Sequence, residues 1–200
     1  MKTYSLLPFT DQTASSGAPR SGSLRDRPIP LEIFAHVTYT QTRLSLSYEL
    51  SGDMTAIAFA PVSPLPQRRD QLWEKTCFEC FLAPQNARQY WEFNLSPSHD
   101  WNCYRFDDHR TGMTPETAWQ QSPFQITQQV TQRKRHLLNC QIDLSPLFPQ
   151  PLPLQLGVTA VIAQPDGSLS YWALSHPTAH ADFHQRDSWI ISLTSIKKSR

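Results

Sequence analysis

The chain has 200 residues, of which 39% are hydrophobic, and it carries 18 basic and 17 acidic side chains. This length and composition suit one domain with a core of its own. The balanced charge argues against a nucleic-acid-binding protein, which needs a basic surface, and against a polybasic membrane anchor.

The first 30 residues of the chain differ in composition from the rest and define the first domain boundary. A short apolar start, residues 1–9, either docks on the domain or frays, and residues 10–28 are rich in Ser, Gly, Pro and charge. Such a composition cannot bury much surface and predicts a flexible linker. We therefore divide the chain into an N-terminal segment with its linker (1–30), a main domain (31–196) and a basic tail (197–200).

From residue 31 onward, short runs alternate between apolar and polar residues, as β-strands do. Most of the 17 prolines lie between these runs, where they interrupt no strand pairing. This pattern predicts an all-β fold, namely an antiparallel two-sheet β-sandwich of the jelly-roll type. The eleven expected strands cover residues 33–39, 43–50, 55–61, 76–83, 90–96, 101–106, 124–132, 136–144, 155–164, 168–175 and 188–194.

Two further features predict the compartment. No apolar run reaches the length of a membrane span, and the N-terminus becomes polar too soon for a signal peptide. We therefore expect a cytoplasmic protein whose four cysteines remain thiols.

The strands within residues 76–106 place charged and aromatic residues on one face. If consecutive strands pair, this face carries Glu79, Glu92, Asn94 and Arg105, and it is framed by Phe81, Tyr90 and Trp101. One interpretation is a solvated sheet face with Glu–Arg cross-strand pairs. The other is a ligand site, in which rings stack on the ligand and charged groups bind its hydroxyls. Trp73, Trp172 and residues 176–184 can then form walls at one end.

The strings LWEKTCFECFLAP, YWEFNLSPS and WNCYRFDDHRTGM, with YSLLPF before them and YWALSHP and DFH after them, resemble a bacterial family of DOMON-like proteins. That family is related to the family-nine carbohydrate-binding modules. The resemblance implies an antiparallel β-sandwich with a ligand groove, which binds sugars in the carbohydrate-binding relatives. It also implies that Trp73 and Trp172 clamp a terminal sugar, and that Glu79 and Arg105 bind its hydroxyls.

We therefore predict a non-enzymatic protein that binds a small ligand, a saccharide, in a groove on one sheet face. Three alternatives stay open. Glu79 and Glu92 can serve as the two carboxylates of a glycoside hydrolase, Met113 and His176 can bind haem as in other DOMON relatives, or the domain binds a protein partner. The predicted binding residues are Trp73, Glu79, Glu92, Asn94, Trp101, Arg105 and Trp172, with His176 and His184 at the rim.

The sequence also contains three candidate metal sites, but each is supported less well than the saccharide site. Cys77 and Cys80 form a CxxC within an expected strand, so they point to opposite faces and are better read as core residues. His176, His180 and His184 have a spacing that suits zinc on a helix, but Pro177 and the short segment argue against a long helix. Asp100, Asp107 and Asp108 leave calcium open as well. No cofactor is predicted, with calcium and haem left as possibilities.

Overall fold

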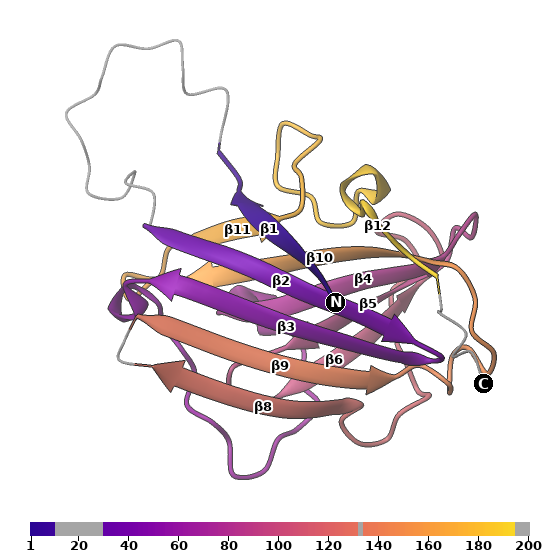
Figure 1. Cartoon of the computed structure of the whole chain (residues 1–200), viewed down its shortest axis with the longest axis horizontal. Coiled ribbons are helices and arrows are strands. Elements are labelled where there is room, and N and C mark those ends of the chain that lie inside the picture. Colours follow the sequence, from indigo (N-terminus) through magenta and orange to yellow (C-terminus); the bar gives the residue numbers. More distant parts are fainter. Residues whose placement is uncertain (11–29, 132–133, 195–200) are drawn as a thin grey trace.

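The structure is a computed structural model that describes residues 1–10, 30–131 and 134–194. Twelve antiparallel strands within these ranges form a curled β-sandwich (Figure 1). In chain order the strands are β1 (Lys2–Pro8), β2 (Leu31–Thr40), β3 (Arg43–Gly52), β4 (Cys77–Pro84), β5 (Tyr90–Leu95), β6 (Trp101–Phe106), β7 (Thr114–Pro115), β8 (Phe124–Thr131), β9 (Arg135–Asp143), β10 (Leu154–Ala163), β11 (Leu169–Ala173) and β12 (Ile191–Leu193).

Helices are short in the described ranges. They comprise the 3₁₀ helices η3 (Met54–Ala56), η4 (Leu72–Glu74) and η5 (Arg186–Ser188). None of the helical segments described has the length and apolar character needed to cross a bilayer.

The sandwich has two layers that share one strand. The first layer has the order β1-β2-β3-β9-β8, and the second has the order β7-β6-β5-β4-β10-β11, with β12 also paired to β10. Strand β1 joins them, because its residues Lys2–Leu6 pair with β2 whereas Leu7 and Pro8 pair with β11. The apolar start of the chain therefore docks as a strand. Residues 11–29, which contain most of the expected linker, and 195–200, with the basic tail, lie outside the described residues.

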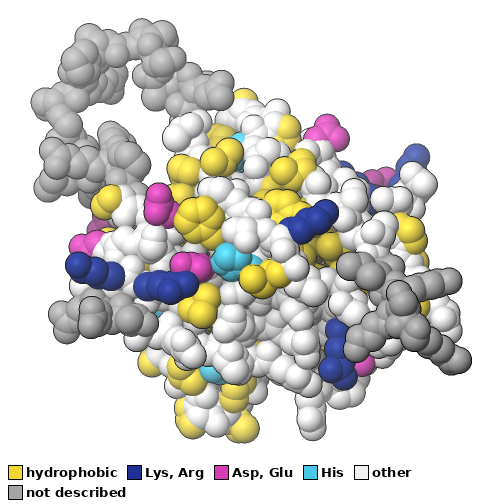
Figure 2. All heavy atoms as spheres, viewed as in Figure 1, with side chains coloured by type: hydrophobic (Ala, Val, Ile, Leu, Met, Phe, Trp, Pro, Cys, Tyr) yellow, Lys and Arg dark blue, Asp and Glu magenta, His cyan; other side chains and the backbone are white. Residues whose placement is uncertain are grey.

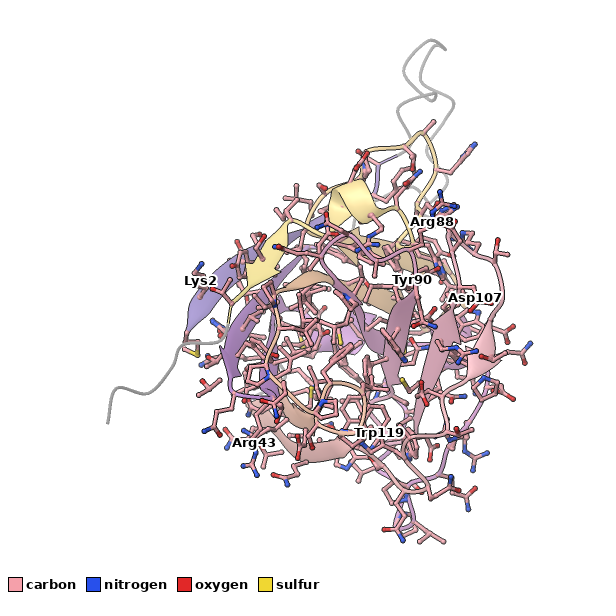
Figure 3. The ribbon with its side chains drawn as sticks, turned by 90° about the vertical axis from the view of Figure 1, so that its right-hand side faces the viewer. Lys2, Arg43, Arg88, Tyr90, Asp107 and Trp119 are labelled. Carbon is pink, nitrogen blue, oxygen red and sulfur yellow. The ribbon has the colours of Figure 1, made fainter. Side chains whose placement is uncertain are left out.

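The main core fills the space between the layers (Figure 3). Strands β2 and β9 alternate buried and less buried residues, since one face meets the core and the other faces solvent. On the solvent side of the first layer, Figure 2 shows charged side chains of both signs scattered over the coloured surface. This distribution agrees with the balanced charge of the sequence.

The second layer is buried on both faces, and this burial creates the site. Strands β4 and β5 are buried at nearly every position. Residues 176–190, which we call the covering segment, lie over the outer face of these strands. From this segment Phe183 and Trp189 pack against Phe81. The outer face of this layer is therefore a second, smaller core with a cavity beside it.

The expected strands are confirmed with one exception, over residues 55–61. There Asp53 accepts hydrogen bonds from the backbone N–H and the hydroxyl of Thr55 at 2.9 and 2.6 Å, and helix η3 begins in place of a strand. An Asp that caps the backbone two residues ahead favours a turn over a strand. The expected strand over residues 124–132 is described as far as Thr131, because residues 132 and 133 lie outside the described ranges.

Candidate functional site

Strands β4 and β5 place two glutamates on the outer face of the second layer. In the register, Glu79 lies opposite Asn94 and Glu92 lies opposite Phe81. Directly opposed residues point to the same side of a sheet, so the predicted shared face of Glu79, Glu92 and Asn94 is confirmed. Cys77 shares that face and Cys80 faces the main core, as the alternation predicted.

The predicted face of β6 is wrong. Trp101 pairs with Leu95 and Arg105 pairs with Trp91, so both project toward the main core. Trp101 is only 1% exposed, and the guanidinium carbon of Arg68 lies 4.2 Å from the centre of its ring. The outer face instead carries Tyr104 and Phe106. Each face of β6 carries one polar residue, Asn102 on the outer face and Arg105 on the core face, so the sequence alternation did not identify the outer face.

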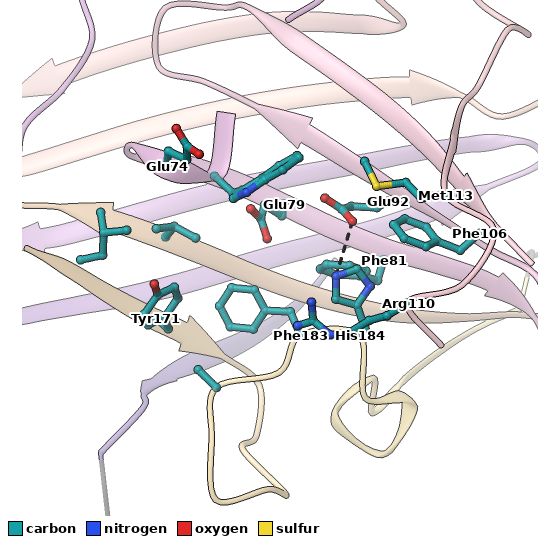
Figure 4. A pocket seen from close by; sticks show the side chains of 14 residues that line it. Glu74, Glu79, Phe81, Glu92, Phe106, Arg110, Met113, Tyr171, Phe183 and His184 are labelled. Carbon is teal, nitrogen blue, oxygen red and sulfur yellow. Dashed lines mark ion pairs between the residues drawn. The ribbon is translucent and has the colours of Figure 1, made fainter. Parts of the chain in front are cut away.

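A cavity of about 460 Å³ opens on this outer face (Figure 4). The buried carboxylates of Glu79 and Glu92 lie on its floor, beside Phe81 and Val161. Its walls are mostly aromatic and come from parts of the chain that are far apart in sequence. They include Trp73 of η4, Phe106 of β6, Tyr171 of β11 and Phe183 of the covering segment, together with Glu74, Arg110, Met113, Leu169, Ala181 and His184.

The two floor carboxylates are strongly desolvated. Glu79 is 3% exposed and Glu92 is 5% exposed. The hydroxyl of Thr159 donates to Glu79 at 3.2 Å, and the amide of Asn94 donates to Glu92 at 2.7 Å. Burial raises the pKa of both carboxyl groups, and for Glu79 the nearby Glu92 raises it further. Both groups therefore hold a proton more readily than an exposed glutamate does.

His184 is fixed at the edge of the cavity by Tyr90. The backbone N–H of Arg110 donates to the Tyr90 hydroxyl at 3.2 Å, and that hydroxyl lies 2.7 Å from Nδ1 of His184. Of the two partners of this hydroxyl among the described residues, only Nδ1 can accept a hydrogen bond, so we assign the hydroxyl hydrogen to Nδ1. The ring proton of His184 then sits on Nε2, which lies 3.8 Å from Oε2 of Glu92.

This contact joins a neutral imidazole to the Glu92 carboxyl group. Burial, aided by the positive charge of Arg110, lowers the pKa of His184 to about 3. A charged imidazolium is therefore absent near neutral pH, and the 3.8 Å contact is not a formed ion pair. His184 serves instead as a neutral N–H donor directed toward the floor of the cavity.

Asp182 ties the covering segment to the loop after β6. It accepts from Nε and Nη2 of Arg110 at 3.0 and 2.8 Å and lies 2.9 Å from Nε2 of His109. Burial alone would raise the pKa of Asp182, but these hydrogen bonds and the charge of Arg110 outweigh it and lower the pKa. Asp182 is therefore a carboxylate, and it neutralises the one cation that lines the cavity in the described part of the chain.

Two predicted binding residues lie elsewhere. Trp172 projects into the main core, where it is 4% exposed and its indole N–H donates to Ser170 at 2.9 Å. The next residue back, Tyr171, lines the cavity in its place. His176 lies beside Leu7, whose carbonyl oxygen is 2.9 Å from Nε2, and its ring contacts Phe9. The prediction that Trp172 forms a cavity wall is therefore wrong, and His176 does not reach this rim.

The structure does bring together Trp73, Glu79, Glu92 and His184, with Asn94 supporting Glu92 from below. The expected wall from residues 176–184 is present, since Phe183 lines the cavity, but the sequence named none of Arg110, Tyr171 and Phe183 as site residues. A signal was present for two of them, since Arg110 lies in WNCYRFDDHRTGM and Phe183 lies in DFH, two of the strings that carried the family resemblance.

The described residues do not bring together a ligand set for haem or for a metal ion. Met113 lines the cavity, whereas His176 lies at the separate site beside Leu7, so this pair does not face one haem. In the described residues, no group of three or more His, Cys, Asp or Glu side chains has a geometry suited to a metal ion. His184 and Asp108 are engaged with Tyr90 and Arg88, respectively.

Comparison with known proteins gives structural matches alone, since no family model and no curated protein matches the chain. A candidate carbohydrate-binding protein from Bacteroides uniformis has a TM-score of 0.67 at 13% identity, over 98% of this chain and 86% of that one. A family 9 carbohydrate-binding module from Caldicellulosiruptor kristjanssonii has a TM-score of 0.53 at 12% identity. It was solved in complexes with glucose and with cellotriose, and the match covers 87% of this chain and 81% and 80% of those chains.

The chain shares the fold of these proteins. At such low identities the likeness establishes the architecture, and the DOMON-like family stays a prediction.

Proposed function

We propose that this protein binds a saccharide, without turnover, in the cavity above Glu79 and Glu92. The observation that carries the proposal is the pairing of these two buried carboxyl groups with aromatic walls in a cavity of about 460 Å³. Small-ligand sites are concave, largely apolar and carry a few convergent polar groups, and they span roughly 300–1,000 Å³. The sugar complexes of the structurally similar family 9 module add support.

The lining residues divide into two roles. The indole of Trp73, held edge-on against Tyr104 at a ring distance of 5.8 Å, offers a flat face to the apolar side of a sugar ring. Glu79 and Glu92 accept hydrogen bonds from hydroxyls, and Nε2 of His184 donates one. The site thus offers both acceptors and a donor beneath an aromatic wall.

A glycoside hydrolase is the second candidate, because two carboxyl groups share the cavity. A hydrolase needs one protonated acid and one ionised base or nucleophile, with environments that separate their pKa values. Here burial raises the pKa of both groups, and the described residues place no charged partner in hydrogen-bond contact with either. Without a charged hydrogen-bond partner among the described residues to keep one carboxylate ionised, the pair favours binding over catalysis.

Isothermal titration of the purified protein against a panel of neutral and charged mono- and oligosaccharides tests the proposal. We expect saturable binding by one class of sugar and at least tenfold weaker binding by Trp73→Ala. Trp119→Ala is the matched control, because it removes a half-buried indole that packs on Phe93 outside the cavity. No binding across the panel, or equal losses in both variants, would contradict the proposal.

The same panel separates binding from hydrolysis. If oligosaccharides are cleaved and Glu79→Gln abolishes cleavage while it preserves binding, the protein is a hydrolase. If they are bound and recovered intact, the non-catalytic proposal is supported.

A further inference from the structure

We infer that the preferred ligand carries an ammonium group, as an amino sugar does, and that this group sits between Glu79 and Glu92. The inference rests on the proposed function, since it names the class of saccharide that the same cavity selects. It depends on three features of the cavity: the placement of the carboxyl groups, their lack of a cationic partner in contact with them among the described residues, and the aromatic walls.

The two carboxyl groups converge from neighbouring strands. Glu79 lies opposite Asn94 and Glu92 lies two residues before Asn94 on β5, so the glutamates are diagonal neighbours on one face. Diagonal neighbours are separated by about 7–8 Å across a sheet, and flexible glutamate side chains can both reach a group placed between them. Figure 4 shows both carboxyl groups on the floor, directed into the cavity.

Their charge has no cationic partner among the described residues that touch them. The partners of Glu79 and Glu92 are a hydroxyl of Thr159 and an amide of Asn94, both neutral. The His184 ring lies 3.8 Å from Glu92 but is held neutral by its buried position. The guanidinium of Arg110 is bonded to Asp182, and although its charge lowers the pKa of Glu92, the effect of burial is larger and leaves that pKa raised. Buried charges in proteins are normally paired, so these carboxyl groups are matched to a cation or a proton from outside the chain.

The walls suit a cation as well as a sugar ring. Trp73, Phe81, Phe106, Tyr171 and Phe183 all line the cavity. The faces of aromatic rings carry partial negative charge and attract ammonium groups, more strongly where water is excluded. An acidic sugar would instead meet Glu74, Glu79 and Glu92 and be repelled.

An amino sugar satisfies all of these features with one molecule. Its ammonium group pairs with the two carboxylates, and its hydroxyls bind His184 and the rim, while its ring lies against Trp73. When the ammonium group binds, its charge lowers the pKa of both glutamates. Binding at pH 6 to 7 therefore releases protons, whereas a neutral sugar that accepts from the protonated carboxyl groups releases none.

The test is isothermal titration with glucosamine and galactosamine, their parent hexoses and their N-acetyl derivatives. Acetylation removes the charge and keeps the ring. We expect an amino sugar to bind roughly tenfold or more tightly than both its parent hexose and its acetylated form. Titrations in two buffers of different protonation enthalpy should show net proton release for the amino sugar alone.

Charge-removing variants locate the ammonium group. Glu79→Gln and Glu92→Gln are isosteric, and each should reduce the preference for the amino sugar over its parent hexose at least fivefold. Glu32→Gln is the matched control, since Glu32 is exposed on β2 and bonds Ser51 away from the cavity. Thermal melting of each variant confirms that it is folded.

The outcomes distinguish a failure of the ammonium inference from a failure of saccharide binding itself. Equal binding of amino, neutral and acetylated sugars, or tighter binding of the acetylated form, would overturn the ammonium inference and leave saccharide binding intact. A preference that survives both glutamate variants would also overturn it. If no sugar of any class binds, the proposed function fails and the inference fails with it.

Discussion

The Tyr90 hydroxyl lies between the backbone N–H of Arg110 and Nδ1 of His184, at 3.2 and 2.7 Å. One hydroxyl group thereby links the loop after β6 to the covering segment and sets the tautomer of the histidine that faces Glu92. Tyr90 itself is held by stacking on Phe106, with ring centres 4.7 Å apart. The orientation of the donor at the cavity edge therefore depends on a residue that does not line the cavity.

Tyr90→Phe tests this dependence. The ring and its stacking remain, but His184 loses the partner of Nδ1 and Arg110 loses an acceptor for its backbone N–H. We expect ligand affinity to fall about three- to tenfold and the free energy of unfolding to fall by about 1–2 kcal/mol. Titration calorimetry and urea denaturation measure the two effects. An affinity equal to that of the parent protein would show that His184 needs no positioning by Tyr90.

Asp182→Asn tests the contact between the covering segment and the loop after β6. Asn accepts a hydrogen bond but lacks the charge that pairs with Arg110 and His109. We expect weaker ligand binding, by about tenfold, because Arg110 and Phe183 are no longer fixed relative to each other. Stability should change by no more than about 1 kcal/mol, since both partners are half exposed.

Asp108→Asn is the control for that variant. Asp108 pairs with Arg88 at 3.3 Å, where Asp108 is half exposed and Arg88 is largely exposed. The control should leave both affinity and stability nearly unchanged. If the two variants behave alike, Asp182 is an ordinary surface carboxylate.

Gly157→Ala tests the packing beneath the covering segment. Gly157 lies on β10 opposite Phe81, and a Cβ atom placed there would clash with the indole ring of Trp189. The indole must move, and with it the packing on Phe81. We expect a loss of about 1–3 kcal/mol in the free energy of unfolding, as for other overpacked cores. Gly167→Asn is the control, because a Cβ there meets nothing within 4 Å and Asn tolerates the left-handed backbone.

The shared face of the two glutamates could be predicted from sequence, because a charged residue in an apolar strand shows which of its neighbours point to the same side. In β4 and β5, Glu79 and Glu92 interrupt apolar residues and so fix which side chains share a face. In β6 the charged residue is Arg105, whose long side chain lies on the core side at the strand end. The charge therefore pointed to the wrong face, and Trp101 was misplaced with it.

The walls of the cavity were harder to predict because they depend on long-range packing. Tyr171 and Trp172 are neighbours on β11, and the choice between them needs the register with β10, in which Ala160 faces Trp172. Phe183 and His184 come from an irregular segment, to which neither a helical nor a strand period applies. Both side chains contact the ring of Phe81 on β4. This contact between distant parts of the chain forms only on folding, so no local sequence pattern predicts it.

His136 supplies a prediction about pH. It is 1% exposed on β9, its ring stacks on Phe59 at 4.4 Å, and neither ring nitrogen has a hydrogen-bond partner in the described residues. Burial lowers its pKa to about 4. The unfolded chain therefore binds a proton at His136 at a higher pH than the folded protein does. The stability that the neutral ring provides is complete above about pH 6.5 and is lost as the pH falls toward 4.

His136→Phe removes this titration and keeps an aromatic ring in the stack. We expect the variant to lose less free energy of unfolding than the parent protein between pH 7 and pH 4.5, as measured by urea denaturation. Glu79 and Glu92 have the opposite effect, because their raised pKa values make stability fall as the pH rises from about 4.5. They are present in both proteins, so the difference between the two curves reports His136 alone. Parallel curves would show that His136 gains no proton on unfolding in this range.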